Sequence, residues 1–126
     1  MQWDVYNEHC PTRILLDQVA DKWTVLVVGA LVEKTKRFGQ LRREIGGVSQ
    51  KMLTQTLRQL ERDGVVSRKV YASVPPKVEY SLTELGRSLM SILATIKEWS
   101  ETHIENVLKA RDEYDARARG CDETKG

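Results

Sequence analysis

The fold is decided by residues 49–64, which read SQKMLTQTLRQLERDG. Ser49 suits the N-cap of a helix because its hydroxyl can accept a hydrogen bond from an amide of the first turn. Gly64 suits the other end, where the backbone turns left-handed. One side of the intervening helix carries leucines at 53, 57 and 60, and the opposite side carries Lys51, Thr54, Gln55 and Arg58. These spacings predict an amphipathic helix with one packed and one polar face.

The polar face has the chemistry of a base-reading surface, since none of its four residues is acidic. Gln pairs with adenine, Arg or Lys pairs with guanine, and a Thr methyl group contacts that of thymine. A solvent-facing helix side is the alternative for an isolated helix. A short helix precedes it, however, with apolar residues at Phe38, Leu41 and Ile45 and a break at Gly46-Gly47. Two helices joined in this way predict a helix-turn-helix whose second helix enters the major groove.

Two further helices are predicted upstream. The first begins at Pro11, a favoured first helical residue, with Cys10 at its cap, and it runs toward Ala20. The second covers residues 23–32. Its predicted buried face consists of Trp23, Leu26, Val27, Ala30 and Leu31.

After Gly64 the apolar period changes from 3.6 to 2, which predicts strands over residues 66–72 and 77–82. The link contains Pro75 and Pro76, which cannot continue a central ladder, so a projecting hairpin is expected. Three cations flank its tip: Arg68, Lys69 and Lys77. We interpret residues 66–82 as a wing that lies along phosphates or in the minor groove.

The last predicted helix covers residues 83–115 and carries an apolar stripe longer than a small core requires. An exposed stripe of this length predicts a two-fold dimer. The residues expected in that contact are Leu89, Ile92, Ile96, Trp99, His103 and Val107. Residues 116–126 are predicted to form a flexible tail.

Charge and size support this interpretation. The 126 residues predict a single domain over 1–126, with a DNA-binding core over about 11–82. Between Lys34 and Lys77 eleven basic residues face three acidic ones, a net charge of +8, so the rest of the chain carries −6. A basic middle between acidic ends favours a polyanion-binding face. No apolar run has the length of a membrane span and no signal peptide begins the sequence, so a cytoplasmic protein is expected.

The stretch from Cys10 to Trp99 resembles the HxlR-type branch of the MarR-related winged helix-turn-helix regulators. The motifs that carry the resemblance are Cys10-Pro11, Lys22-Trp23-Thr24, the RFGQL of 37–41, the SQKMLTQTLR of 49–58, the LERDG of 60–64, the VPPKVEYSLT of 74–83 and the ELG of 84–86. The fold expected is mainly α with a small β-hairpin wing, dimerised through N- and C-terminal helices.

The resemblance implies a homodimer on an inverted-repeat operator in double-stranded DNA, with half-sites about 34 to 36 Å apart. It also implies control of a nearby gene in response to oxidants or electrophiles through Cys10. A thiol at a helix N-terminus is physically suited to this role, because the helix dipole favours the reactive thiolate. Relatives with a second cysteine near the C-terminus make a bridge between Cys10 and Cys121 of the two subunits a hypothesis.

The residues expected to contact DNA are Arg37, Arg42, Ser49, Gln50, Lys51, Thr54, Gln55, Arg58, Arg68, Lys69 and Lys77. Two interpretations remain beside a redox-sensing regulator. One is a regulator that binds a reversible aromatic ligand near Trp3, Tyr6, Trp23 or Trp99. The other is a winged-helix module that binds an acidic protein. His9, Cys10, His103 and Cys121 lack the paired spacing of a zinc site, and no phosphate loop or nucleophile elbow is found, so neither a metal, a cofactor nor an enzyme is expected.

Overall fold

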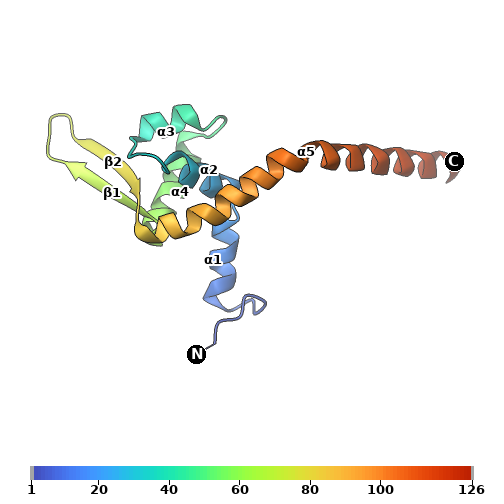
Figure 1. Cartoon of the computed structure of the whole chain (residues 1–126), viewed down its shortest axis with the longest axis horizontal. Coiled ribbons are helices and arrows are strands. Elements are labelled where there is room, and N and C mark those ends of the chain that lie inside the picture. The colour runs from blue at the N-terminus through green and yellow to red at the C-terminus, as the bar shows by residue number, and fades with distance from the viewer. Residues whose placement is uncertain (1, 126) are drawn as a thin grey trace. The chain divides into compact units, whose positions relative to one another are not determined.

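The structure is a computed structural model, and it describes the backbone of residues 2–125 and the side chains of residues 2–120. Within this range the elements are α1 (Pro11–Val19), α2 (Lys22–Ala30), α3 (Phe38–Glu44), α4 (Gln50–Arg62), β1 (Val66–Tyr71), β2 (Lys77–Leu82) and α5 (Glu84–Lys125) (Figure 1). The chain divides into two units, residues 1–94 and 95–126. No helix among the described residues is both long and apolar enough to cross a membrane.

Both ends of α4 are built as the sequence predicts. The Ser49 hydroxyl accepts a hydrogen bond of 3.1 Å from the backbone N–H of Met52, which satisfies an amide that the helix leaves unpaired. At the other end Gly64 has a φ of 76°, in the left-handed region. The N–H of Val65 then donates to the carbonyl of Leu60 at 2.9 Å, the bond that closes a Schellman motif. These two caps fix the length of α4.

Removal of the N-cap should weaken the fold without touching the core. We expect Ser49→Ala to lower the free energy of unfolding by about 1 kcal/mol, because one amide of the first turn loses its partner. Urea unfolding followed by circular dichroism measures this loss, and Ser49→Asp should recover most of it. Gln50→Ala, one residue further along and exposed, is the matched control with no expected loss. An unchanged midpoint for Ser49→Ala would contradict the capping role.

The core of the first unit joins α2, α3, α4, the hairpin base and the first part of α5. Its most buried members are Val27, Val28, Leu31, Leu41, Leu53, Leu57 and Val66. The prediction for α2 was wrong in part, because Thr24 and Val28 are buried while Leu26 is 40% exposed. The apolar residues of α2 surround most of the helix, so their spacing does not select one face.

The hairpin is antiparallel, with Val66 opposite Leu82 at its base and Tyr71 opposite Lys77 near its tip. It projects from the helical part of the first unit, next to α3 and α4 (Figure 1). Only the base residues Val66 and Leu82 are buried among its strand residues. A short third partner pairs with β2, because Lys36 and Tyr80 exchange two backbone hydrogen bonds of 3.0 and 2.8 Å.

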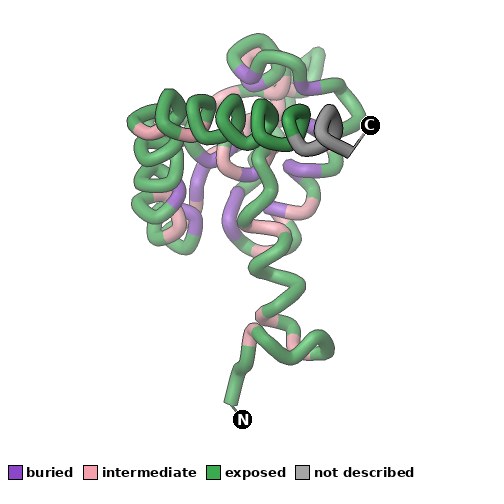
Figure 2. Tube along the Cα trace, turned by 90° about the vertical axis from the view of Figure 1, so that its right-hand side faces the viewer, coloured by how far each residue is buried: buried purple, intermediate pink, exposed green. Residues whose placement is uncertain are grey.

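The first and last helices differ in how they meet the core. Helix α1 has no buried residue, which Figure 2 shows along the tube toward the N-terminus. Helix α5 continues to Lys125, beyond the end that the sequence predicts near residue 115. Residues 112–119 contain no Gly or Pro and include four Ala or Arg residues, all favourable in a helix. None of residues 95–120 is buried, so the second unit has no core of its own among these side chains, and the single-domain expectation stays a prediction.

Candidate nucleic-acid interface

The turn between α3 and α4 places the two helices of the helix-turn-helix. Gly47 has a φ of 81°, a conformation that favours glycine, and it lies two residues before the Ser49 cap. At the start of α3 the backbone N–H of Arg37 donates to the side-chain oxygen of Gln40 at 2.8 Å. Lys36 forms an ion pair with Glu44 at the end of α3. Both ends of α3 are therefore tied to the chain that flanks them.

The face of α4 predicted to read bases is open to solvent. Gln50, Lys51, Gln55 and Arg58 are exposed, while the leucines on the other side are buried. Thr54 is half-buried and its hydroxyl donates to the carbonyl of Gln50 at 2.7 Å. That hydroxyl proton is occupied, so the group that Thr54 offers to a base is chiefly its methyl. The division of α4 into a packed and a polar face is confirmed.

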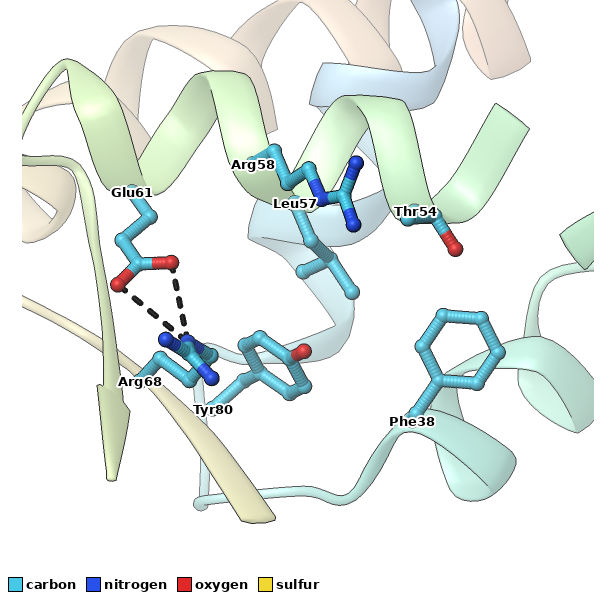
Figure 3. Close-up of a pocket in the computed structure, with 7 residues that line it drawn as sticks. All are labelled: Phe38, Thr54, Leu57, Arg58, Glu61, Arg68 and Tyr80. Atoms are coloured by element: carbon cyan, nitrogen blue, oxygen red, sulfur yellow. Dashed lines mark hydrogen bonds and ion pairs between the residues drawn. The ribbon is translucent and has the colours of Figure 1, made fainter. Parts of the chain in front are cut away.

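A hollow of about 330 Å³ lies between α4, the start of α3 and the hairpin (Figure 3). Its lining residues are Phe38, Thr54, Leu57, Arg58, Glu61, Arg68 and Tyr80. The structure thus brings Thr54 and Arg58 of the reading face to the same site as Arg68 of the wing. Burial raises the pKa of Tyr80 above its ordinary value, since the phenolate would lose solvation in this hollow.

Arg68 does not stand free at this site. Its Nε donates to the two carboxylate oxygens of Glu61 at 3.2 and 3.4 Å, and Figure 3 shows both contacts. Glu61 is not among the residues that the sequence predicts at this site. Glu61 is on a helix and Arg68 on a strand, seven positions later, and no fixed spacing rule relates such a pair, so only the turn at Gly64 brings them together.

The two lysines of the wing lie around Tyr71. The ammonium groups of Lys69 and Lys77 are 4.9 and 5.3 Å from the centre of its ring. Lys77 also pairs with Glu79 at 2.9 Å, and this hydrogen bond lowers the pKa of the Glu79 carboxyl, with smaller contributions from the charge of Lys77 and from the Tyr71 hydroxyl. Part of the positive charge expected on the wing is therefore neutralised within the hairpin.

The remaining residues predicted to contact DNA lie outside the hollow. Arg37 and Arg42 are exposed, at the start and in the last turn of α3. Gln55 is on another flank of α4, where it lines a shallow hollow with Asp21 and Thr24 at the start of α2. The structure brings Gln55 to α2 and not to the wing.

Cys10 occupies the N-cap of α1, as predicted, with Pro11 as the first helical residue. Its Sγ lies 3.0 Å from the Thr12 hydroxyl and accepts a hydrogen bond of 3.4 Å from the backbone N–H of Asp4. The Thr12 hydroxyl, followed by the amides of Asp4 and Thr12, lowers the pKa of the Cys10 thiol, while desolvation and the charge of Asp4 oppose the shift. The half-buried thiol is thus biased toward the thiolate.

The predicted dimer residues fall into two groups. Ile92, Ile96 and Trp99 are 59, 49 and 58% exposed, whereas Leu89, His103 and Val107 are half-buried. The ring centroids of Trp99 and His103 are 5.0 Å apart. The side chain of Cys121 lies outside the described residues. No cluster of three or more His, Cys, Asp or Glu suited to a metal occurs among the residues that the structure describes.

The chain is similar to known helix-turn-helix regulators. A profile of the HxlR-like helix-turn-helix family matches residues 18–108. The uncharacterized HTH-type transcriptional regulator YtfH of Escherichia coli K12 is 48% identical over 110 residues, which are 87% of each chain. The structure of ytfH from Salmonella typhimurium, a proposed transcriptional regulator, is 44% identical with a TM-score of 0.83, covering 88% of this chain and 99% of that one.

A redox regulator is also among the similar structures. HypR in its reduced form is 45% identical with a TM-score of 0.71, covering 79% of this chain and 98% of its own. HypR in its oxidized form is 47% identical with a TM-score of 0.68, covering 74% of this chain and 96% of its own.

Proposed function

Because the chain belongs to the HxlR-like helix-turn-helix family of transcriptional regulators, we propose that it binds one operator sequence as a homodimer and releases it upon oxidation. The observation that carries the DNA-binding part is the polar face of α4. Helix α4 is capped at both ends, and the four central positions of its polar face contain no acidic residue. This face is exposed beside a hairpin that carries cations.

The residues divide by role. Gln50, Lys51, Thr54, Gln55 and Arg58 contact base edges or the nearest phosphates, and Ser49 holds the start of the reading helix. Arg37 and Arg42, at the start and in the last turn of α3, and Lys69 of the wing contact the phosphate backbone, which supplies affinity without sequence choice, while Lys77 stays paired with Glu79.

The homodimer is supported by apolar surface that the chain does not cover by itself. Helix α1 leaves Ile14, Leu15 and Leu16 exposed, in addition to Ile96 and Trp99 of α5. Within the first unit an apolar hollow of about 210 Å³ lies between α1 and the first turns of α5. Apolar patches of this kind mark association surfaces, and a two-fold axis would present two α4 helices to successive major grooves.

The signal is proposed to be oxidation or electrophile attack at Cys10. Two observations support it: the hydrogen bonds that favour the Cys10 thiolate, and the similarity to HypR, which is a redox regulator. Loss of the thiolate, as a sulfenic acid or a disulfide, changes the hydrogen bonds that Cys10 makes with Asp4 and Thr12 at the start of α1, and α1 belongs to the proposed dimer surface. The proposal includes a disulfide between Cys10 of one subunit and Cys121 of the other, formed upon oxidation.

The test is an anisotropy titration of the reduced protein on duplex DNA from its own upstream region, with a scrambled duplex as control. Selective binding that diamide abolishes and dithiothreitol restores would support the whole proposal. Selective binding that does not change with diamide would instead indicate a reversible small-molecule effector. Equal binding to both duplexes, or binding only to acidic proteins, would contradict sequence-specific regulation at this site.

A second prediction isolates the thiol. In a Cys121→Ser background, Thr12→Val should remove the hydrogen bond with the largest effect on Cys10 and raise the pKa of its thiol. We expect the midpoint of the pH profile of iodoacetamide alkylation to move to higher pH, with slower alkylation at neutral pH. Thr95→Val, far along the chain in α5, is the matched control. A profile that does not move would show that Thr12 does not stabilise the thiolate.

A further inference from the structure

The wing has little apolar anchorage. Val66 and Leu82 at its base are 2 and 6% exposed, and every other strand residue is exposed or half-buried. A two-stranded hairpin is marginally stable in water without further support. Additional links must therefore fix the angle at which the wing leaves the helices.

Two such links meet at one level of the hairpin, just beyond its base. Arg68 of β1 and Tyr80 of β2 are opposite each other in the register. Tyr80 is bound through its backbone to Lys36, in the segment before α3. Arg68 is bound through its guanidinium to Glu61 of α4. The hairpin is thus tied to the segment that precedes α3 and to α4 at the same level.

The charges in the hollow indicate what this pair does. Arg58 is one turn before Glu61 on α4, and Figure 3 marks no hydrogen bond or ion pair between its guanidinium and the other residues that line the hollow. Arg68, in contrast, pairs with Glu61, the one carboxylate among the described residues that line the hollow. An unpaired carboxylate beside DNA phosphates would repel them, so Glu61 needs its partner when DNA is bound.

We propose that Arg68 is a positioning residue, whose ion pair with Glu61 sets the angle between the wing and α4, and that it does not contact a phosphate. This inference rests on the proposed function and revises the sequence-based expectation for Arg68. Both side chains are close to half exposed, 45 and 39%, so the pair adds little to the stability of the fold. Its effect is expected in DNA binding.

Glu61→Gln gives the sharpest test, because loss of a repelling charge and loss of the ion pair predict opposite changes in operator affinity. A loss of one negative charge next to DNA should by itself strengthen binding. If the ion pair between Glu61 and Arg68 holds the wing against α4, a role that we call the latch, E61Q should weaken operator binding about fivefold. Arg68→Glu, which sets two carboxylates together, should weaken it more than about tenfold. The exchange E61R/R68E, with unchanged net charge, should return to within about threefold of the original affinity.

Salt dependence separates a latch from a phosphate contact. Across a potassium chloride series the slope of log affinity should be the same for E61R/R68E and the unaltered protein, whereas Lys69→Gln, the matched control on the same strand, should reduce it by about 0.9. A slope reduced by about 0.9 in E61R/R68E, with affinity no better than that of R68E, would overturn the inference. Tighter binding by E61Q would overturn it as well.

A measurement without DNA keeps this inference distinct from the proposed function. Amide hydrogen exchange of residues 66–71 and 77–82 should be faster in E61Q than in the unaltered protein, and should recover in E61R/R68E. Unchanged exchange in E61Q would overturn the latch, whatever the protein binds. A lack of operator selectivity in the unaltered protein would count against the proposed function, and the exchange experiment would still decide the latch.

Discussion

Gly86→Ala is expected to destabilise the protein by about 2 to 3 kcal/mol, although alanine favours helices over glycine by about 1 kcal/mol. Gly86 is in the first turn of α5. A Cβ atom built there would lie 2.2 Å from the carbonyl oxygen of Val65 and 3.1 Å from a methyl group of Leu82. The first contact is far inside the van der Waals limit and involves backbone, so rotation of a side chain cannot relieve it.

The backbone that would have to move is held by several hydrogen bonds. The carbonyl of Val65 accepts from the backbone N–H and from the hydroxyl of Thr83, each at 3.1 Å. The same hydroxyl accepts from the N–H of Gly86 at 3.1 Å, which caps α5. A shift of α5 away from Val65 would strain all three contacts. Overlap therefore outweighs helix propensity at this residue.

Thermal unfolding at fixed protein concentration measures this effect, and a midpoint lower by about 10 °C is expected. Gly29→Ala is the matched control, because Gly29 is inside α2 and nothing lies within 4 Å of a Cβ atom built there. That variant should gain up to about 1 kcal/mol from helix propensity. Equal midpoints for both variants would show that α5 can move away from Val65 without loss.

The sequence predicts most of α4 because its signals are local. The Ser49 cap, the Gly64 terminus and the leucine period each act within a few residues, and each is found as expected. The same holds for the hairpin, whose period of two and paired prolines place both strands. Local signals fail for α2, where Leu26 and Val28 are both apolar and only packing decides which is buried.

The candidate site shows the same division. Exposure of the reading face follows from periodicity, so Lys51 and Arg58 could be placed from the sequence. The partner of Arg68 could not, because it depends on how the strand leaves the helix after Gly64. Lys77 and Glu79, in contrast, are two residues apart on one strand and share one of its faces, so the period of two could have indicated their pairing. Charge counted along a chain therefore overestimates the cations that remain free to meet DNA.

Ile96→Asp is expected to have the largest effect on function, because it places a carboxylate in the proposed dimer contact. Ile96 is 49% exposed in the chain, so nothing within the described protomer requires its burial. In a two-fold contact the change is made twice, and each unpaired carboxylate would have to lose its hydration. We expect the protein to sediment as a monomer at micromolar concentration.

Loss of the dimer should mainly lower the affinity for the operator. Two α4 helices joined in one dimer bind two half-sites together, and their separation removes the gain from the second, effectively intramolecular, contact. Operator affinity should therefore fall about 100-fold or more, while weak binding to a single half-site persists. Sedimentation velocity and anisotropy on one-half-site and two-half-site duplexes measure both consequences.

Ala94→Asp is the matched control, since Ala94 is exposed and two residues, or about 200°, away from Ile96 around α5. It adds the same charge to the same helix and should leave a dimer with nearly unchanged operator affinity. If Ile96→Asp also stays dimeric, the exposed stripe of α5 is not the association surface, and α1 would have to supply it alone. If both variants become monomers, added charge on α5 prevents assembly wherever it is placed. A dimer contact that buries Ile96 would be broken by Ile96→Asp and not by Ala94→Asp, so this outcome would contradict the burial of Ile96.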